Sequence, residues 1–294
     1  MKNFNNKIVV ITGAGSGMGR AYAVEFAKLG ARLALNDYDI KGLAETVALL
    51  DDSSPNKVYS ASFDVSDRAA MESFAADVQT QLGNAHIIIN NAGVSGEGKP
   101  VWATPLATIE RVMNINFYGV VHGTQVFLPQ LIENGEGAVV NVSSIFGLIG
   151  PPNNCDYSAA KFAVRGFTEA LMVELHDSPI SVHLVHPGGI ATNIANVPQH
   201  QAFSDKYLST PPEAIVRYVI RGIRRGTPKI VYGKDSFKTW FGANFVPLRF
   251  LNKIIWWDMR DVIDRSDYPL QPAATKPMIT PTATATPIKE RNAG

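Results

Sequence analysis

Residues 7–19 read KIVVITGAGSGMG, an apolar run followed at once by a glycine-rich turn. A short, continuous apolar run is typical of a strand that is buried on both faces of a sheet. Residues 17–29 continue with the pattern of a helix that Gly30 ends. In a strand–turn–helix unit, glycines let the backbone approach a pyrophosphate, and the helix N-terminus offers it free N–H groups. The stretch therefore predicts the first unit of a dinucleotide-binding fold.

The rest of the chain alternates short β-branched runs with longer helical patterns. Further strands are predicted at 32–36, 57–61, 85–90, 137–142, 180–186 and 229–231. Helices are predicted at 40–50, 67–82 with Ser66 as N-cap, 105–133 as one long helix, 156–176 and 212–225. Such alternation is typical of βαβ units. We predict an α/β fold of the doubly wound Rossmann type, in three layers: a seven-stranded parallel sheet with helices on both faces.

The composition limits the function classes that need to be considered. The net charge of +1 gives no reason to expect a nucleic acid as partner. The single cysteine forms no internal disulfide, and the six histidines lack ligand-type spacing, so we expect no metal site. Residues 1–6 are polar and no apolar run of about eighteen residues occurs, so we expect a cytoplasmic protein without a signal peptide or membrane span.

The chain divides into three predicted parts. Residues 1–235 form the catalytic domain, with a loop-like substrate lid at 192–211; residues 236–265 form an aromatic-rich extension; residues 266–294, rich in Pro, Thr and Ala, form a disordered tail. Aromatic and basic residues at 237–259 are compatible with peripheral contact to a membrane. Their moderate basic content favours the alternative, a helix packed over the substrate cleft or against a neighbouring subunit.

Asp37 stands at the end of the second predicted strand. A carboxylate there can accept hydrogen bonds from the adenosine ribose hydroxyls and repels a 2′-phosphate, which favours NAD(H) over NADP(H). The alternative is that Asp37 starts a turn or caps the next helix. Tyr38 and Lys41 nearby leave an NADP(H)-preferring reductase open. Arg20, in the first helical turns, is predicted to face solvent.

Tyr157 and Lys161 lie four residues apart in a predicted helix, and Ser144 lies thirteen residues before the tyrosine. Side chains four apart share a helix face. An ammonium beside a phenol favours the phenolate, so we expect a lowered tyrosine pKa. Such a tyrosine suits proton transfer to or from an alcohol oxygen near neutral pH.

Over about residues 5–235 the chain resembles the short-chain dehydrogenase/reductase family, because several of the family's motifs occur in the expected order. Residues 12–19 match T-G-x-x-x-G-x-G, residues 90–93 match N-N-A-G, residues 157–161 match Y-x-x-x-K and residues 187–192 match P-G-x-x-x-T. The resemblance, together with the glycine turn and Asp37, implies that the cofactor is held by Gly13, Ser16, Gly17, Met18, Gly19, Asp37, Asp64, Val65, Asn91, Ala92, Gly93, Tyr157, Lys161, Pro187, Gly188, Ile190 and Thr192.

The resemblance also implies the catalytic roles. Tyr157 acts as general acid/base, Lys161 lowers its pKa and binds the nicotinamide ribose, Ser144 bonds the substrate oxygen, and Asn116 holds a water of a proton relay. Ser143 and Asn114 are the competing candidates for the serine and asparagine roles. His186 could reach the cofactor, although a hydrogen-bonded histidine at a strand end is favoured, and Cys155 is favoured as a structural residue.

The substrate class follows from the residues expected around the tyrosine. Ser144, Ile145, Asn154 and Tyr157 are the predicted substrate contacts, and no arginine stands among the pocket candidates to bind an anion. We therefore expect a neutral, hydrophobic secondary alcohol or ketone. The alternatives are an NADP(H)-preferring carbonyl reductase and a non-catalytic dinucleotide-binding protein. The resemblance further implies a homodimer or homotetramer built through the helices of 105–133 and 156–176.

Overall fold

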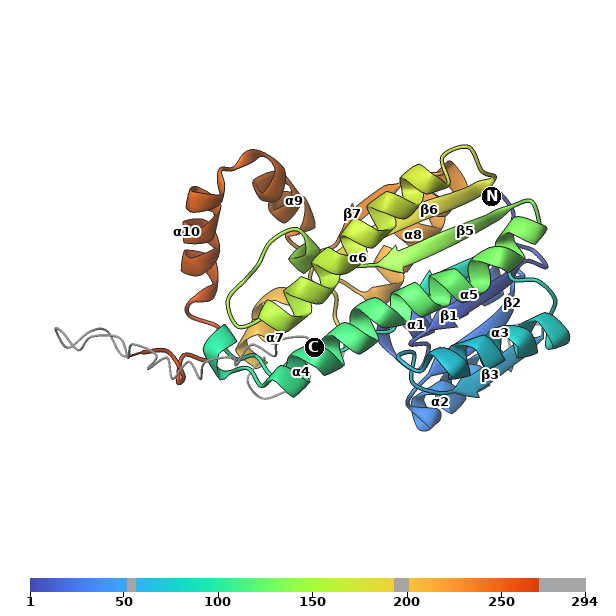
Figure 1. The fold of residues 1–294 in the computed structure, drawn as a ribbon, viewed down its shortest axis with the longest axis horizontal. Helices are drawn as coiled ribbons and strands as arrows, with labels where there is room; N and C mark the ends of the chain where they lie inside the picture. Colours follow the sequence, from blue (N-terminus) through green and yellow to red (C-terminus); the bar gives the residue numbers. More distant parts are fainter. Residues whose placement is uncertain (52–56, 193–200, 270–294) are drawn as a thin grey trace, which may run out of the picture.

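The structure, a computed structural model, describes residues 1–51, 57–192 and 201–269. Within these residues seven parallel strands form one sheet in the order β3-β2-β1-β4-β5-β6-β7. The strands are β1 (Ile8–Thr12), β2 (Arg32–Asp37), β3 (Val58–Ser62), β4 (Ile87–Asn90), β5 (Gly137–Val142), β6 (Ile180–Pro187) and β7 (Lys229–Tyr232). The predicted doubly wound fold is confirmed (Figure 1).

Two apolar clusters fill the space on either side of the sheet, because successive strand residues point to opposite faces. One cluster joins β1 to α1 (Gly17–Lys28) and α8 (Pro212–Arg225). The other joins the opposite face of β1 to α3 (Arg68–Gln81), α5 (Gly119–Glu133) and α6 (Cys155–Glu174). Val9 and Ile11 belong to the first cluster, whereas Ile8 and Val10 belong to the second. This alternation fixes the three layers.

The strand order reverses at β1, which pairs with β2 on one side and with β4 on the other. Open α/β sheets bind ligands outside the carboxyl ends of the strands at such a switch point. Thr12, Asp37, Asn90 and Val142 end their strands at this edge. The topology therefore gathers the predicted motifs at one edge of the sheet.

Two helix predictions need correction. Asp67, not Ser66, caps α3: its side chain accepts from the Ala70 amide at 3.0 Å, while the Ser66 hydroxyl donates to Asp64 at 2.8 Å. The helix predicted for 105–133 is three segments: α4 (Leu106–Met113), a π-helical turn η2 (Asn114–Tyr118) and α5. The π turn inserts where the candidate asparagine lies, and such turns often accompany functional sites.

The lid region contains a helix that the sequence pattern did not predict. α7 (Gln201–Tyr207) lies within the stretch interpreted as a loop, while residues 193–200 lie outside the described residues. Tyr207 ties α7 to the extension, because its hydroxyl bonds the Asp258 carboxylate at 2.8 Å. α2 (Ile40–Asp51) and the 3₁₀ turns η1 (Val101–Ala103) and η3 (Ile145–Gly147) complete the domain.

The extension forms two helices, α9 (Ser236–Phe245) and α10 (Leu248–Met259), which project from one end of the sheet (Figure 1). The chain then returns to the body: Asn153 donates to the Asp264 carbonyl at 2.7 Å, and the Tyr268 hydroxyl donates to Asn153 at 2.9 Å. Trp102 donates to the Asp267 carbonyl at 2.9 Å. The first residues of the predicted tail are thus bound to the domain, and residues 270–294 lie outside the described residues.

None of the helices in the described part of the chain has both the length and the apolar character needed to cross a bilayer.

Candidate active site

The glycine turn after β1 is held by the residues that follow β4. The Thr12 hydroxyl accepts from the amides of Asn91 and Ala92, each at 3.1 Å, and the Asn91 side chain donates to the Thr12 carbonyl at 3.1 Å. Gly13 has φ +67°, and a Cβ there would lie 2.8 Å from the Ala92 Cα. Only glycine fits this conformation and this approach. The two motifs form one backbone surface at the sheet edge.

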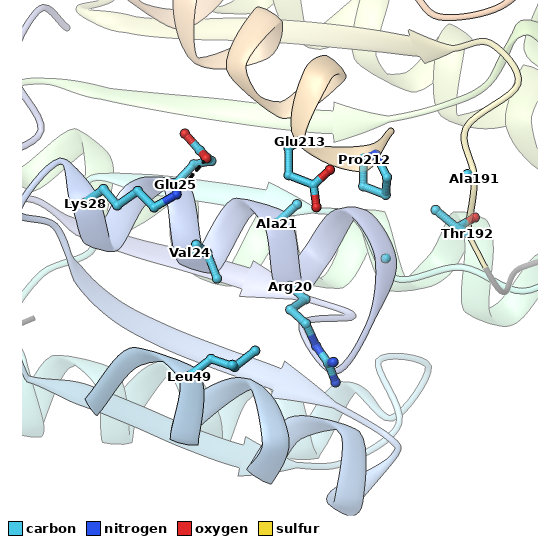
Figure 2. Close-up of a pocket in the computed structure, with 11 residues that line it drawn as sticks. Arg20, Ala21, Val24, Glu25, Lys28, Leu49, Ala191, Thr192, Pro212 and Glu213 are labelled. Carbon is cyan, nitrogen blue, oxygen red and sulfur yellow. Dashed lines mark hydrogen bonds and ion pairs between the residues drawn. The ribbon is translucent and has the colours of Figure 1, made fainter. Parts of the chain in front are cut away.

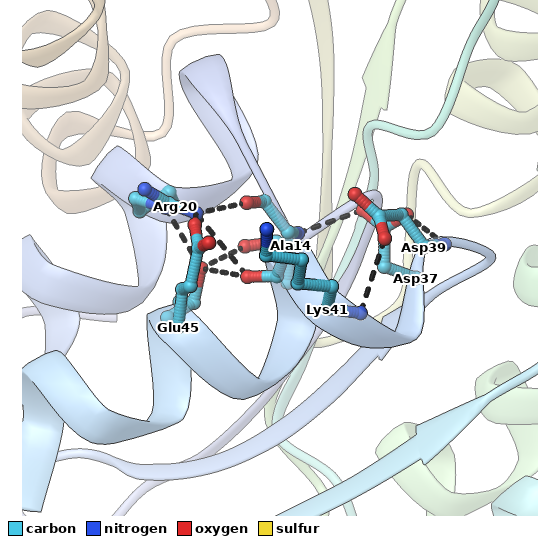
Figure 3. A network of polar contacts seen from close by, with 9 residues as sticks. Ala14, Arg20, Asp37, Asp39, Lys41 and Glu45 are labelled. Atoms are coloured by element: carbon cyan, nitrogen blue, oxygen red, sulfur yellow. Dashed lines mark hydrogen bonds and ion pairs between the residues drawn. The ribbon is translucent and has the colours of Figure 1, made fainter.

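Asp37 lies beside this turn at the end of β2. One carboxylate oxygen accepts from the Gly15 amide at 2.7 Å and the other from the Asp39 amide at 2.8 Å (Figure 3). The alternative that Asp37 starts a turn is therefore confirmed, and its contact with a cofactor ribose stays a prediction. Each oxygen retains further acceptor capacity, since a carboxylate can accept about four hydrogen bonds.

Arg20 is half-buried and bonded rather than free in solvent, which corrects the prediction. Its guanidinium donates to the Gly15 carbonyl at 2.5 Å, to Thr46 at 2.9 Å and to Glu45 at 3.0 Å (Figure 3). The reason is the packing of α1 against α2, which presents a carbonyl, a hydroxyl and a carboxylate to the same side chain. Arg20 thus braces the turn.

The other predicted cofactor residues fall along the same edge. Asp64 and Val65 follow β3, and the Asp64 carboxylate accepts from the Ser66 amide at 2.9 Å. Gly188 follows β6, and its amide bonds the Tyr232 carbonyl at 2.8 Å. The remaining residues take these places: Ser16 at the N-cap of α1, Gly17 and Gly19 in its first turn, Met18 with its side chain in the core, Pro187 at the end of β6, and Ile190 buried behind it.

A groove of about 530 Å³ opens beside the turn, along the outer side of α1 (Figure 2). Gly17 and Thr192 line it at one end, and the Thr192 methyl carbon lies 3.0 Å from where a Gly17 Cβ would stand. None of the predicted catalytic side chains borders this groove. The candidate site is instead defined by the side chains at the ends of β4, β5 and the start of α6.

Tyr157 and Lys161 lie on the same face of α6, and Ser144 meets them from the end of β5. The Lys161 ammonium lies 5.6 Å from the centroid of the Tyr157 ring and donates to the Val142 carbonyl at 3.0 Å. The Ser144 hydroxyl accepts from the Phe146 amide at 3.1 Å and lies close enough to the Tyr157 phenol to act on its pKa. Ser143 turns the other way, and its hydroxyl donates to the Lys161 carbonyl at 2.8 Å. The geometry therefore favours Ser144 over Ser143 for contact with a substrate.

Burial controls the protonation of this pair. Burial raises the pKa of Tyr157 to about 12, although the hydrogen bond with Ser144 acts in the opposite direction. Burial also lowers the pKa of Lys161 to about 8, so its ammonium is mostly charged at neutral pH. The expected lowering of the tyrosine pKa is wrong for the protein alone, because loss of solvent outweighs the neighbouring cation.

Asn116 is fully buried in the π turn, whereas its competitor Asn114 is exposed. Its side chain pairs with both backbone groups of Val94, accepting from N–H and donating to C=O, each at 2.8 Å. Gly93 fits between the two candidates: a Cβ there would lie 3.2 Å from the Asn116 oxygen and 3.4 Å from the Lys161 nitrogen. The Asn116 amide is thus already paired with the Val94 backbone, and its part in a proton relay stays a prediction.

The other predicted substrate contacts, Ile145 in η3 and Asn154 at the N-cap of α6, are both half-buried. The Asn154 side chain donates to the Pro152 carbonyl at 2.9 Å. The sulfur of Cys155, also half-buried, lies 3.9 Å from the Thr104 hydroxyl.

His186 is buried, and its Nδ1 lies 2.7 Å from the Ser144 carbonyl, as expected for a histidine bonded at a strand end. Burial lowers the pKa of His186 to about 4, so the ring is neutral at physiological pH.

An aromatic wall lies beside Tyr157. The Phe146 ring lies 6.2 Å from the Tyr157 ring and 5.9 Å from Phe203 of α7, which in turn lies 5.0 Å from Tyr207. Phe146 and Phe203 fall in segments that the sequence marks as pocket candidates, residues 145–148 and 193–208, but the contact between them comes from the tertiary structure.

Comparison with known proteins gives the family. The model described as "short chain dehydrogenase" matches residues 7–202. The chain belongs to the short-chain dehydrogenase family. Within this family it is 41% identical over 248 residues to a Mycobacterium tuberculosis protein, SadH, provisionally named an oxidoreductase; the match covers 80% of this chain and 89% of that protein.

Two solved structures of short-chain dehydrogenases are similar to this one. One is a short-chain dehydrogenase/reductase from Burkholderia phymatum in complex with NAD, with a TM-score of 0.75, 27% identity and coverage of 92% of this chain and 99% of that chain. The other is a levodione reductase, with a TM-score of 0.72, 29% identity and coverage of 79% and 98%.

Proposed function

We propose that this short-chain dehydrogenase transfers hydride between NAD(H) and a neutral, hydrophobic secondary alcohol or ketone, with Tyr157 as general acid/base. The observation that carries the proposal is the contact of Tyr157 with Ser144 in front of the Lys161 ammonium. A phenol, a hydroxyl and a cation converge at the sheet edge where the glycine turn also lies. This is the chemistry that a carbonyl oxygen needs when it becomes an alcohol.

The residues at the turn fit a dinucleotide. Gly13 brings backbone to within contact of Ala92 without a side chain between, and α1 begins at Gly17 with its N-terminal amides toward the same edge. Gly13, Ser16, Gly17 and Gly19 would hold the pyrophosphate, and Asp37 the adenosine ribose. Asp64 and Val65 would contact the adenine. The nicotinamide would be bordered by residues 91–93, 187–188, 190 and 192. Bound there, the nicotinamide supplies or takes up the hydride.

Each side chain then has a defined task at the substrate oxygen. Tyr157, protonated at neutral pH because its pKa is raised to about 12, donates a proton to the oxygen of a ketone. Ser144 donates a hydrogen bond to the same oxygen and stabilises the charge that develops on it. The Lys161 ammonium lies behind the phenol, where its charge favours the phenolate left after donation. In the alcohol direction the Tyr157 phenolate accepts the proton from the alcohol oxygen, while the Lys161 ammonium stabilises that phenolate.

NAD(H) is favoured over NADP(H) by the charges around the turn. A 2′-phosphate at the ribose would meet the Asp37 carboxylate, and the Arg20 guanidinium is already bonded to Gly15, Thr46 and Glu45. An NADP(H)-preferring reductase remains the alternative, and the two cofactors are compared directly in the experiment below.

A hydrophobic substrate is supported by the aromatic wall of Phe146 and Phe203, which offers apolar contact beside the phenol. The similar levodione reductase, named for a dione, is in keeping with a ketone.

The test is a turnover screen with NADH and NADPH against neutral and acidic ketones, with Tyr157→Phe as control. We expect neutral ketones to be preferred and the Tyr157→Phe variant to lose about 100-fold or more of the activity. A tenfold preference for acidic ketones would contradict the substrate class. Turnover unaffected by Tyr157→Phe would contradict the catalytic role.

The oligomeric state and the cellular location of the protein are also proposals. We propose a homodimer or homotetramer through α4–α5 and α6, where Tyr118 and Phe162 expose 47% and 41% of their surface. A monomer by light scattering would contradict this interface. A cytoplasmic location stays a prediction from the sequence.

A further inference from the structure

The aromatic hairpin, residues 236–259, exposes large apolar side chains on both of its helices. Phe237 on α9 is 70% exposed and Trp257 on α10 is 72% exposed. Five more apolar residues of the hairpin are exposed: Phe241, Phe245, Leu248, Phe250 and Ile254. Few apolar side chains of this size lie in water without a function when they are adjacent in the fold. The exposed apolar surface of the hairpin therefore indicates a binding site for a partner.

The exposed residues follow helical spacing. Phe237, Phe241 and Phe245 are four apart and share one face of α9, and the Phe241 and Phe245 rings lie 5.1 Å from each other. Residues 250, 254 and 257 share one face of α10 in the same way. The residues that pack inward are different: Ser236 and Gly242 of α9, and Ile255 and Met259 of α10. The hairpin thus holds to the body by one side and presents apolar faces on the other.

The charge of the hairpin distinguishes the partner. The hairpin contains the cations Lys238, Arg249 and Lys253 and one acidic residue, Asp258, whose carboxylate is bonded by Lys206 and Tyr207 of α7, whereas the chain as a whole carries 27 basic and 26 acidic residues. Lys238 also pairs with Asp235, just before α9, at 3.2 Å. All three cations are exposed. The Arg249 guanidinium lies 4.5 Å from the centroid of the Phe250 ring, so charge and aromatic surface are side by side. An anionic surface with an apolar interior complements this arrangement.

We propose that the aromatic hairpin binds the surface of an anionic lipid bilayer. Aromatic residues prefer the interface between headgroups and acyl chains, and cations beside them add attraction to anionic lipids. α10 has 12 residues, which gives a length of about 18 Å against a hydrocarbon core of about 30 Å. The hairpin therefore lies in the interface rather than crossing it.

The position of the hairpin links lipid binding to the candidate active site. α9 packs against η3, which carries Phe146 beside Tyr157, and Asp258 at the end of α10 is bonded by Lys206 and Tyr207 of α7. A bilayer bound to the hairpin would lie close to the aromatic wall of Phe146 and Phe203. This consequence rests on the proposed function, whereas the lipid binding itself does not.

The test is co-sedimentation of the full chain with vesicles of phosphatidylcholine alone and of phosphatidylcholine with phosphatidylglycerol. Two variants address the two contributions: Phe237→Ser with Trp257→Ser, and Lys238→Gln with Arg249→Gln and Lys253→Gln. Val173→Ser is the matched control, since Val173 is a 77% exposed apolar residue on α6, away from the hairpin. Thermal unfolding shows that each variant is folded, and light scattering gives its oligomeric state.

We expect the wild type and Val173→Ser to sediment with anionic vesicles more than with neutral ones. The cation variant should bind roughly fivefold more weakly for each charge removed, and the aromatic variant about tenfold more weakly or beyond. Wild type that stays in the supernatant with both vesicles overturns the proposal, as does an aromatic variant that binds like wild type. If wild type fails to bind and the aromatic variant instead breaks up an oligomer, the face is an interface between copies. Since none of these readouts measures turnover, failure here is distinct from failure of the proposed function.

Discussion

The Lys161 ammonium lies 5.6 Å from the centre of the Tyr157 ring, one helical turn along α6, and both side chains are shielded from water strongly enough to shift their pKa values in opposite directions. Burial favours the neutral form of each group. At neutral pH the protein alone therefore holds a protonated phenol beside an ammonium whose pKa is lowered to about 8, which is the state suited to proton donation to a ketone.

Tyr157→Phe is expected to lower kcat by about 100-fold or more, since proton transfer by a positioned group contributes at least that factor. The ring keeps its packing against Phe146. The melting temperature should therefore change little. Steady-state kinetics with the best ketone of the screen and thermal unfolding check the two expectations. Tyr218→Phe, which removes the same hydroxyl from a 39% exposed tyrosine on α8, outside the site, serves as control.

The Lys161 pKa predicts a dependence of stability on pH. The folded pKa is about 8 against 10.5 unfolded, so between these values the unfolded chain binds more protons. The free energy of unfolding contributed by this group therefore rises with pH from about 8 to 10.5, by up to about 3 kcal/mol. Urea unfolding of wild type and Lys161→Met at pH 7.5, 9 and 10 measures the difference. Parallel curves for the two proteins would contradict the burial effect.

Asp37→Asn and Asp37→Ala separate the charge of Asp37 from its hydrogen bond. Asn retains one acceptor oxygen for the Gly15 amide, which Asp37 bonds at 2.7 Å, but carries no charge. We expect both variants to lose about tenfold in kcat/KM with NADH, and Asn to gain with NADPH because the repulsion of a 2′-phosphate is gone. An Asp37→Ala variant with unchanged use of both cofactors would contradict the ribose contact.

Gly93→Ala places a methyl group 3.2 Å from the Asn116 oxygen and 3.4 Å from the Lys161 nitrogen. We expect activity to fall about tenfold through displacement of Lys161, since a misplacement of 1 Å can cost a factor of about 100. Gly166→Ala is the control, because a Cβ at Gly166 meets open space. That variant should keep its activity and gain up to about 1 kcal/mol of stability in the helix. Equal activities for the two variants would argue against the close packing around Lys161.

Most of the fold could be predicted from local patterns in the sequence. The apolar runs that became β1, β4 and β5 are continuous because both faces of the sheet are covered, and the glycines before α1 mark a turn that few other residues can form. The spacing of Tyr157 and Lys161 placed them on one helix face. These features depend on neighbours within a few residues, so the sequence contains them directly.

Other features depend on residues far apart in the chain. The Arg20 side chain is bonded rather than free in solvent because α2 brings Thr46 and Glu45 within hydrogen-bond distance of it. The choice of Asp67 over Ser66 as helix cap depends on Ser66 being bonded to Asp64 instead. The periodicity of the sequence does not show that the Ser66 side chain is bonded to Asp64, which leaves Asp67 to cap the helix.

By itself, then, the sequence determined the order of strands and helices, the glycine turn and the identity of the residues that meet at its edge, because these follow from short-range spacing and backbone preference. Only the tertiary structure decided that the Tyr157 pKa rises, that Phe203 closes against Phe146, and that residues 264–268 return to Asn153 while the aromatic hairpin stays exposed. Desolvation and contact are properties of the assembled fold, since they depend on which distant groups take the place of water.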